Sequence, residues 1–89
     1  MDSIELFRKE IDKIDENMIK LLADRCDICR KVASYKKINN IPMMQPERIN
    51  LVINRSIKIA ESYNMSAEMI REIFMTIINY SCEIEDKII

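Results

Sequence analysis

The chain has 89 residues and a mass of 10.6 kDa, which limits it to one small domain, and it contains no glycine, histidine or tryptophan. Without glycine there is no loop that lets the backbone close on phosphates, and without histidine neither a Ser-His-Asp triad nor an HExxH zinc site can form. Fourteen basic and fifteen acidic residues give a net charge of -1, which argues against a general binder of nucleic acids or membrane surfaces. Any basic site must therefore be local.

Three cysteines are an odd number, and the acidic, amphipathic N-terminal stretch lacks the apolar core of a signal peptide. Together these two features predict reduced thiols and a cytoplasmic protein. Cys26 and Cys29 form a C-x-x-C within a helical pattern, but a third cysteine and no histidine fall short of four zinc ligands. We therefore expect no metal and no cofactor, and we interpret the cysteines as small, partly buried side chains. No run of residues approaches the roughly 18 apolar residues of a membrane span.

Helical periodicity runs through the whole chain, and it predicts a single all-α domain over residues 1–89. The expected helices cover about 3–38, 46–62 and 66–88. Pro42 and Pro46 mark the first break, while Asn64 and Ser66 have the residue types of a helix C-terminal cap and a helix N-cap at the second.

The first predicted helix carries an apolar stripe, with steps of three and four residues over more than four heptads. About 35 residues at 1.5 Å each span roughly 52 Å, whereas a compact chain of this length has a diameter of roughly 31 Å. Because the stripe extends past its own globule, we expect a second copy to cover it in an intertwined homodimeric helical bundle. The stripe consists of Ile4, Phe7, Ile11, Ile14, Met18, Leu21, Ile28, Val32 and Tyr35.

Arg25 interrupts this stripe at the position where the stepping next requires an apolar residue. No carboxylate lies on the same face to neutralise it, and a buried unpaired charge costs several kcal/mol. An anion must therefore come from another helix, another subunit or a ligand, unless the guanidinium extends to solvent. Lys36 lies eleven residues on, about 20° around the helix and roughly 16 Å along it, so two cations share one face.

The later elements add polar residues to this picture. Met43 and Met44 lie in the loop nearest the two cations, where they could line a pocket, and we interpret them first as ordinary loop anchors. Arg48 stands in the first turn of the second helix, where the helix dipole opposes a cation. Ser81 and Glu85 continue one side of an otherwise apolar third helix. A polar cluster of this kind inside a helical bundle indicates a pocket for a small anion with more than one carboxylate or phosphate.

With these residues in place, the sequence resembles the all-helical class of chorismate mutases, from about residue 4 to residue 88. The resemblance implies three-helix chains that intertwine as dimers, and a Claisen rearrangement of chorismate to prephenate in phenylalanine and tyrosine synthesis. This reaction transfers no proton and forms no covalent intermediate, which is compatible with a chain that lacks histidine. The matching segments are Arg8-x-x-Ile11-x-x-Ile14-Asp15-Glu16, Leu21-Leu22-Ala23-Asp24-Arg25, Lys36, Ile41-Pro42, Pro46-Glu47-Arg48, and Ser81 with Glu85.

The resemblance also implies roles for the residues of the pocket. Arg25 and Ser81 would bind a carboxylate, and Lys36 would bind both a carboxylate and the breaking ether oxygen. Many members have glutamine at the position of Glu85, where an ionised carboxylate can only accept a hydrogen bond. We therefore expect Glu85 to act in its protonated form, with an activity that falls as the pH rises.

Four further positions complete the implied site. Arg8 would reach in from the partner subunit, and Arg48 would support the second carboxylate or order the loop. The backbone at Gln45 would contact the substrate hydroxyl, although its side chain replaces the acidic N-cap of many members and predicts a weaker cap. Ile49 stands where members often have a glutamate that accepts from the 4-hydroxyl of chorismate.

Because of these departures, two alternatives to a chorismate mutase stay open. Isochorismate-pyruvate lyases share the fold, the Arg/Lys set and an apolar residue at the position of Ile49, whereas Ser81 is typical of a mutase. The second alternative is a helical dimer module that binds an anion of the aromatic pathway without turnover. We expect no nucleic acid and no membrane among the partners in any of the three cases.

Overall fold

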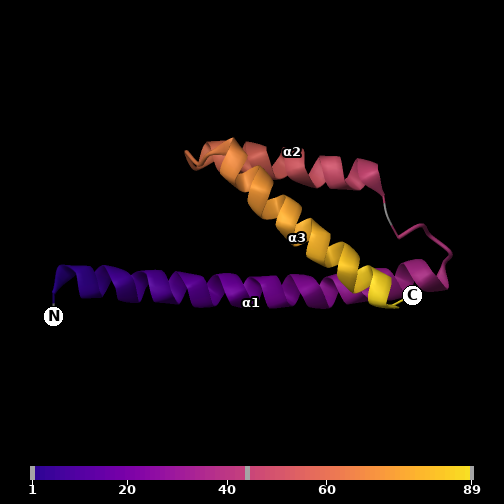
Figure 1. The fold of residues 1–89 in the computed structure, drawn as a ribbon, viewed down its shortest axis with the longest axis horizontal. Coiled ribbons are helices and arrows are strands. Elements are labelled where there is room, and N and C mark those ends of the chain that lie inside the picture. Colours follow the sequence, from indigo (N-terminus) through magenta and orange to yellow (C-terminus); the bar gives the residue numbers. More distant parts are fainter. Residues whose placement is uncertain (1, 44, 89) are drawn as a thin grey trace.

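The computed structural model describes residues 2–43 and 45–88, which form three helices (Figure 1). Helix α1 spans Ser3–Ile38, α2 spans Pro46–Ser62 and α3 spans Ala67–Ile88, and this part of the chain contains no strand. The expected all-α class, with three helices and a long first one, is confirmed.

The helix ends follow local signals in the sequence. The Asp2 side chain caps α1 by accepting from the backbone N–H two residues further on, at 3.2 Å. The Ser66 hydroxyl accepts from the Met69 amide at 3.2 Å and caps α3, and Asn64 adopts the left-handed backbone that ends α2 (φ 57°). Gln45 precedes α2 without a side-chain hydrogen bond, so the weak cap expected there is confirmed.

Helix α3 holds the fold together, because it packs against both α1 and α2. In Figure 1, α3 runs diagonally from the far end of α2 to the C-terminal part of α1, and α2 runs in the opposite direction to α1. The molecule measures 57 × 24 × 15 Å, and its radius of gyration of 16.5 Å exceeds the roughly 12 Å of a compact chain of this length. The N-terminal half of α1 therefore extends beyond the rest of the chain.

The core lies between α2 and α3, where Val52, Ile53 and Ile78 are buried together. From α1, only Ala33 is buried among the residues that the structure describes. None of the described helices is long and apolar enough to cross a membrane. The apolar stripe of α1 is about half exposed or more along its N-terminal part, at Ile4, Phe7, Ile11, Ile14, Met18 and Leu21.

Candidate active site

All three helices and the first loop line one pocket of about 340 Å³. This volume lies within the usual range for small-molecule sites. Four cationic side chains and one acidic side chain line it, which is the local excess of positive charge expected from the sequence. The polar lining consists of Arg25, Lys36, Gln45, Arg48, Arg55, Ser81 and Glu85, and the remaining lining of Ile28, Cys29, Val32, Met43, Ile49, Val52, Phe74, Ile78 and Cys82.

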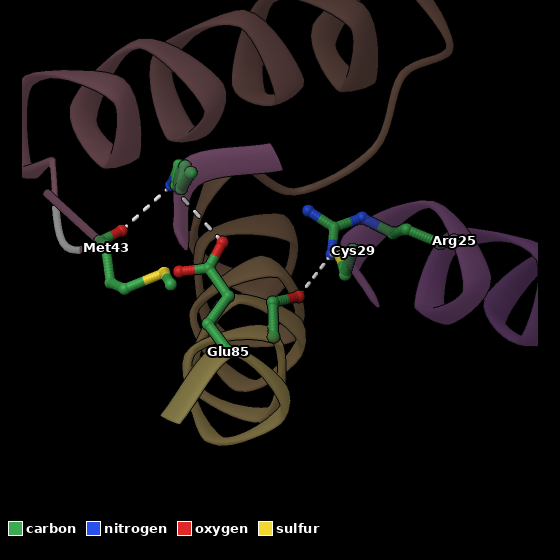
Figure 2. Close-up of polar contacts among 6 residues, drawn as sticks. Arg25, Cys29, Met43 and Glu85 are labelled. Atoms are coloured by element: carbon green, nitrogen blue, oxygen red, sulfur yellow. Dashed lines mark hydrogen bonds and ion pairs between the residues drawn. The ribbon is translucent and has the colours of Figure 1, made fainter. Parts of the chain in front are cut away.

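At one part of the pocket, Arg25 of α1 meets Ser81 of α3. Nη1 of Arg25 donates to the Ser81 hydroxyl and also lies 3.7 Å from the sulfur of Cys29, one turn further along α1 (Figure 2). The Ser81 hydroxyl donates in turn to the Ile77 carbonyl at 2.9 Å, which leaves an oxygen lone pair for Arg25. A guanidinium has five N–H donors, and no carboxylate within the described ranges pairs with this one. Arg25 is therefore held in place with donors left for an anion.

Lys36 and Glu85 form the second polar cluster, between α1 and α3 (Figure 2). Nζ of Lys36 donates to the Met43 carbonyl at 2.9 Å and lies 3.3 Å from Oε1 of Glu85. Both side chains of the ion pair are largely shielded, with exposed fractions of 14% and 13%. The ammonium has three donors, so one remains available to a substrate.

Cys82 lies beside the second cluster, and the charges of that cluster change the pKa of its thiol. Burial raises the pKa of the Cys82 thiol, and the carboxylates of Glu85 and Asp86 raise it further, while Lys36 lowers it in part. The thiol is consequently neutral near pH 7. Cys82 thus contributes an uncharged wall to the pocket next to the Lys36–Glu85 pair.

The structure brings together every expected site residue except Arg8. Gln45, Arg48 and Ile49 line the pocket from the start of α2, together with Arg25, Lys36, Ser81 and Glu85. Arg8 is exposed and lies 3.7 Å from Glu5, a surface ion pair of the kind that contributes little to stability. Seventeen residues separate it from Arg25, or about 25 Å along the helix. Within one chain, Arg8 therefore lies outside the pocket.

Several lining residues were not among the expected site residues, and three of them bear on the polar side of the pocket. Met43 was interpreted as a loop anchor, with a place in the pocket lining as the alternative, and the alternative holds: Met43 lines the pocket and its carbonyl accepts from Lys36. Met44 lies outside the described residues. Cys29 contacts Arg25. Arg55 lines the pocket from α2. Its spacing from Arg48 could have indicated this position in the sequence, because seven residues place both arginines on one face of the helix.

Residues 7–86 match the model of the family described as chorismate mutase type II. The chain belongs to this family. Type II chorismate mutases are isomerases with an all-helical fold, which agrees with the three helices and the polar pocket described above. The match covers all of the expected site residues, Arg8 included.

Similar proteins carry this family's names. A 4-amino-4-deoxychorismate mutase of Streptomyces pristinaespiralis is 31% identical over 86 residues, which cover 97% of this chain and 67% of that protein. A chorismate mutase of Methanocaldococcus jannaschii is 32% identical over 74 residues, covering 83% of this chain and 75% of that protein. In structure, the chain is similar to a conserved hypothetical protein from Pyrococcus furiosus, with a TM-score of 0.71, 30% identity, and coverage of 96% of this chain and 97% of the other.

Proposed function

We propose that this chain binds chorismate in the pocket between its helices and rearranges it to prephenate, which feeds phenylalanine and tyrosine synthesis. In this reaction the ether C–O bond breaks while a C–C bond forms within the same molecule. The enzyme must hold a dicarboxylate in a compact shape and stabilise the negative charge that develops on the ether oxygen. The observation that carries the proposal is the joint placement of the Arg25–Ser81 and Lys36–Glu85 clusters in one pocket.

Each cluster has a role that follows from its chemistry. Arg25 offers a planar fork of donors that can bind a carboxylate through two hydrogen bonds, with Ser81 fixing its orientation. Lys36 has one free N–H for the second carboxylate, and a substrate that displaces Glu85 from Lys36 gains another N–H for the ether oxygen. Glu85 donates to the same oxygen once it is protonated, because an ionised carboxylate would repel the developing charge.

The start of α2 completes the pocket. Arg48 and Gln45 both line the pocket. In the proposed complex, Arg48 adds a second guanidinium for the substrate carboxylates and the backbone of Gln45 contacts the substrate hydroxyl. Ile49 offers only an apolar wall. A neutral hydroxyl tolerates such a wall better than a charged group does, because an unpaired charge is costlier to remove from water.

We also propose that two chains form an intertwined homodimer, in which Arg8 of each chain enters the pocket of the other. The exposed stripe on α1 supports this assembly, since Phe7 and Leu21 are 62% and 67% exposed in the single chain. Arg8 follows Phe7 directly on the same extended half of α1. A cation placed there reaches a pocket only in another molecule, because its own pocket is about 25 Å away.

The cytoplasm is the proposed location of the reaction. All three cysteines, Cys26, Cys29 and Cys82, are free thiols, which is typical of a reducing compartment.

A second candidate substrate is 4-amino-4-deoxychorismate, on which the Streptomyces relative acts according to its name. This substrate carries an amine in place of the 4-hydroxyl. A protonated amine would enter a pocket with four cations, in which Glu85 is the single acid among the described lining residues and already pairs with Lys36. We therefore expect chorismate to be preferred.

The proposal is tested by incubating the purified chain with chorismate, with 4-amino-4-deoxychorismate and with isochorismate, and identifying the products. Prephenate as the fastest product supports the proposed function. Faster turnover of the amino compound assigns the chain to that substrate, whereas salicylate plus pyruvate from isochorismate assigns it to the lyase reaction. Binding of chorismate without any product would leave a non-catalytic helical module.

A further inference from the structure

Arg55 lines the pocket from the middle of α2, although it is exposed and was absent from the expected site. Its guanidinium has neither a hydrogen bond nor an ion pair with any residue in the described part of the chain. Arg55 is thus an exposed cation in the lining of the proposed substrate site, without a polar partner in the described chain.

The spacing on α2 places Arg55 on the same side as two other lining residues. Arg48, Val52 and Arg55 follow each other at steps of four and three residues, so they share one helix face. Seven residues correspond to about 10.5 Å along the helix axis. Arg48 lies in the first turn of α2, and Arg55 lies two turns further along it. Because α2 runs opposite to α1 (Figure 1), this direction matches the direction on α1 from Lys36 back to Arg25.

The other charged residues of the pocket indicate what Arg55 can do there. Lys36 is already paired with Glu85, and Arg25 is fixed by Ser81, whereas Arg55 is free to turn toward a ligand. The chain as a whole has one more acidic than basic residue, so its overall charge does not attract a dianion. A cluster of cations around one concave site focuses the field and raises the rate at which an anion is captured.

We propose that Arg55 is an outer binding residue that captures the dicarboxylate substrate and guides it to Arg25 and Lys36. This inference rests on the proposed function, because it assigns a role at the same site. Arg55 has no contact with the breaking bond in this role, so it acts on substrate binding and not on the rearrangement. Its contribution is electrostatic and is therefore screened by salt.

The test compares Arg55→Gln with the matched control Lys58→Gln, measuring kcat and KM for chorismate at low ionic strength and in 1 M salt. Lys58 is exposed on the same helix and does not line the pocket, and its substitution by Gln removes the same charge as Arg55→Gln. Two substrate charges acting on Arg55 across about 9 Å of water correspond to an effect of about fivefold. We expect Arg55→Gln to raise KM by about this factor at low salt, with kcat unchanged and the effect below about twofold at 1 M salt, where the screening length is about 3 Å.

Two more variants separate charge from structure. Arg55→Lys keeps the charge and should retain most of kcat/KM, while Arg55→Met removes the charge and keeps a long, helix-favouring side chain. Equal KM values for Arg55→Gln and Lys58→Gln, an effect independent of salt, or a loss confined to kcat would each overturn the assignment of Arg55. If the wild-type chain itself forms no prephenate, the proposed function fails instead, and the two failures are thereby distinguished.

Discussion

Nζ of Lys36 lies 3.3 Å from Oε1 of Glu85, although the two residues are 49 positions apart in the chain and belong to different helices. The pair sits in the pocket at the position where the ether oxygen of the substrate is proposed to lie. Without a ligand, the ammonium and the carboxylate neutralise each other. A bound dicarboxylate competes with Glu85 for Lys36, because both present carboxyl oxygens to the same ammonium.

The first prediction follows from this competition. We expect kcat/KM with chorismate to fall as the pH rises, by up to about tenfold per pH unit, because only protonated Glu85 can donate to the ether oxygen. Glu85→Gln supplies an amide donor at every pH and should give a nearly flat profile over about pH 5 to 9. Glu83→Gln, an exposed position on α3 outside this pocket, serves as the control and should keep the slope. A slope that persists in Glu85→Gln would assign the titration to another group.

The second prediction concerns Arg25. Arg25→Ala removes the guanidinium held by Ser81 and should lower kcat/KM by about thirtyfold or more, since losing one partner of the charge pair proposed between Arg25 and a substrate carboxylate costs about 2–5 kcal/mol. Its thermal unfolding should stay close to that of the wild type, because Arg25 has no carboxylate partner in the described chain. Arg30→Ala is the matched control, as Arg30 is exposed on α1 and pairs with Asp27 at 2.8 Å. Unfolding of Arg25→Ala, or retained turnover, would contradict the role given to Arg25.

The features that depend on local sequence were predictable. The length of α1 and the ends of α2 follow from apolar spacing and from Pro46, and Arg25 was recognisable because it interrupts an apolar stripe. Ser81 and Glu85 were recognisable as polar residues on an apolar face. Residue type and spacing along one helix were sufficient in each case.

The contacts between elements were not predictable in the same way. The bond from Lys36 to the Met43 carbonyl depends on the path of the loop, and every residue has such a carbonyl, so no residue type indicates it. Arg55 stands on an exposed helix face, where arginine is ordinary, and only the packing of α2 and α3 makes that face the side of a pocket. The surface that covers the α1 stripe belongs to a second chain in the proposed dimer, so the structure of one chain does not contain this contact.

The third prediction uses the raised pKa of Cys82. Because the thiolate is the reactive form, iodoacetamide should modify Cys82 slowly at neutral pH and faster as the pH rises toward its elevated pKa. Glu85 is one of the charges that raise this pKa, so Glu85→Gln should lower it and accelerate alkylation at a given pH. Peptide mass spectrometry after timed labelling measures the rate, with Cys26, which does not line the pocket, as an internal reference. An unchanged ratio of Cys82 to Cys26 labelling in Glu85→Gln would count against this account of the charges.

The fourth prediction addresses the exposed stripe of α1. Ile14→Glu places a charge in the middle of the stripe, where Ile14 is 58% exposed in the single chain. If two chains cover each other there, the substitution buries an unpaired charge at the interface and should convert dimer to monomer with loss of activity. Glu16→Gln, on the polar side of the same helix, should leave the dimer intact. Sedimentation velocity measures both, and an Ile14→Glu chain that stays dimeric would place the interface elsewhere.

The fifth prediction asks whether Arg8 completes the pocket of another chain. Arg8→Ala and Arg25→Ala should each be nearly inactive alone, whereas Lys9→Ala, next to Arg8 and also exposed, should be active. When the two inactive chains are unfolded and refolded together in equal amounts, about half of the dimers contain one of each. One of the two pockets in such a dimer then has both arginines intact, so activity should recover to about a quarter of the wild-type value. A mixture that stays inactive, or an Arg8→Ala chain with full activity, would show that Arg8 does not act across the interface.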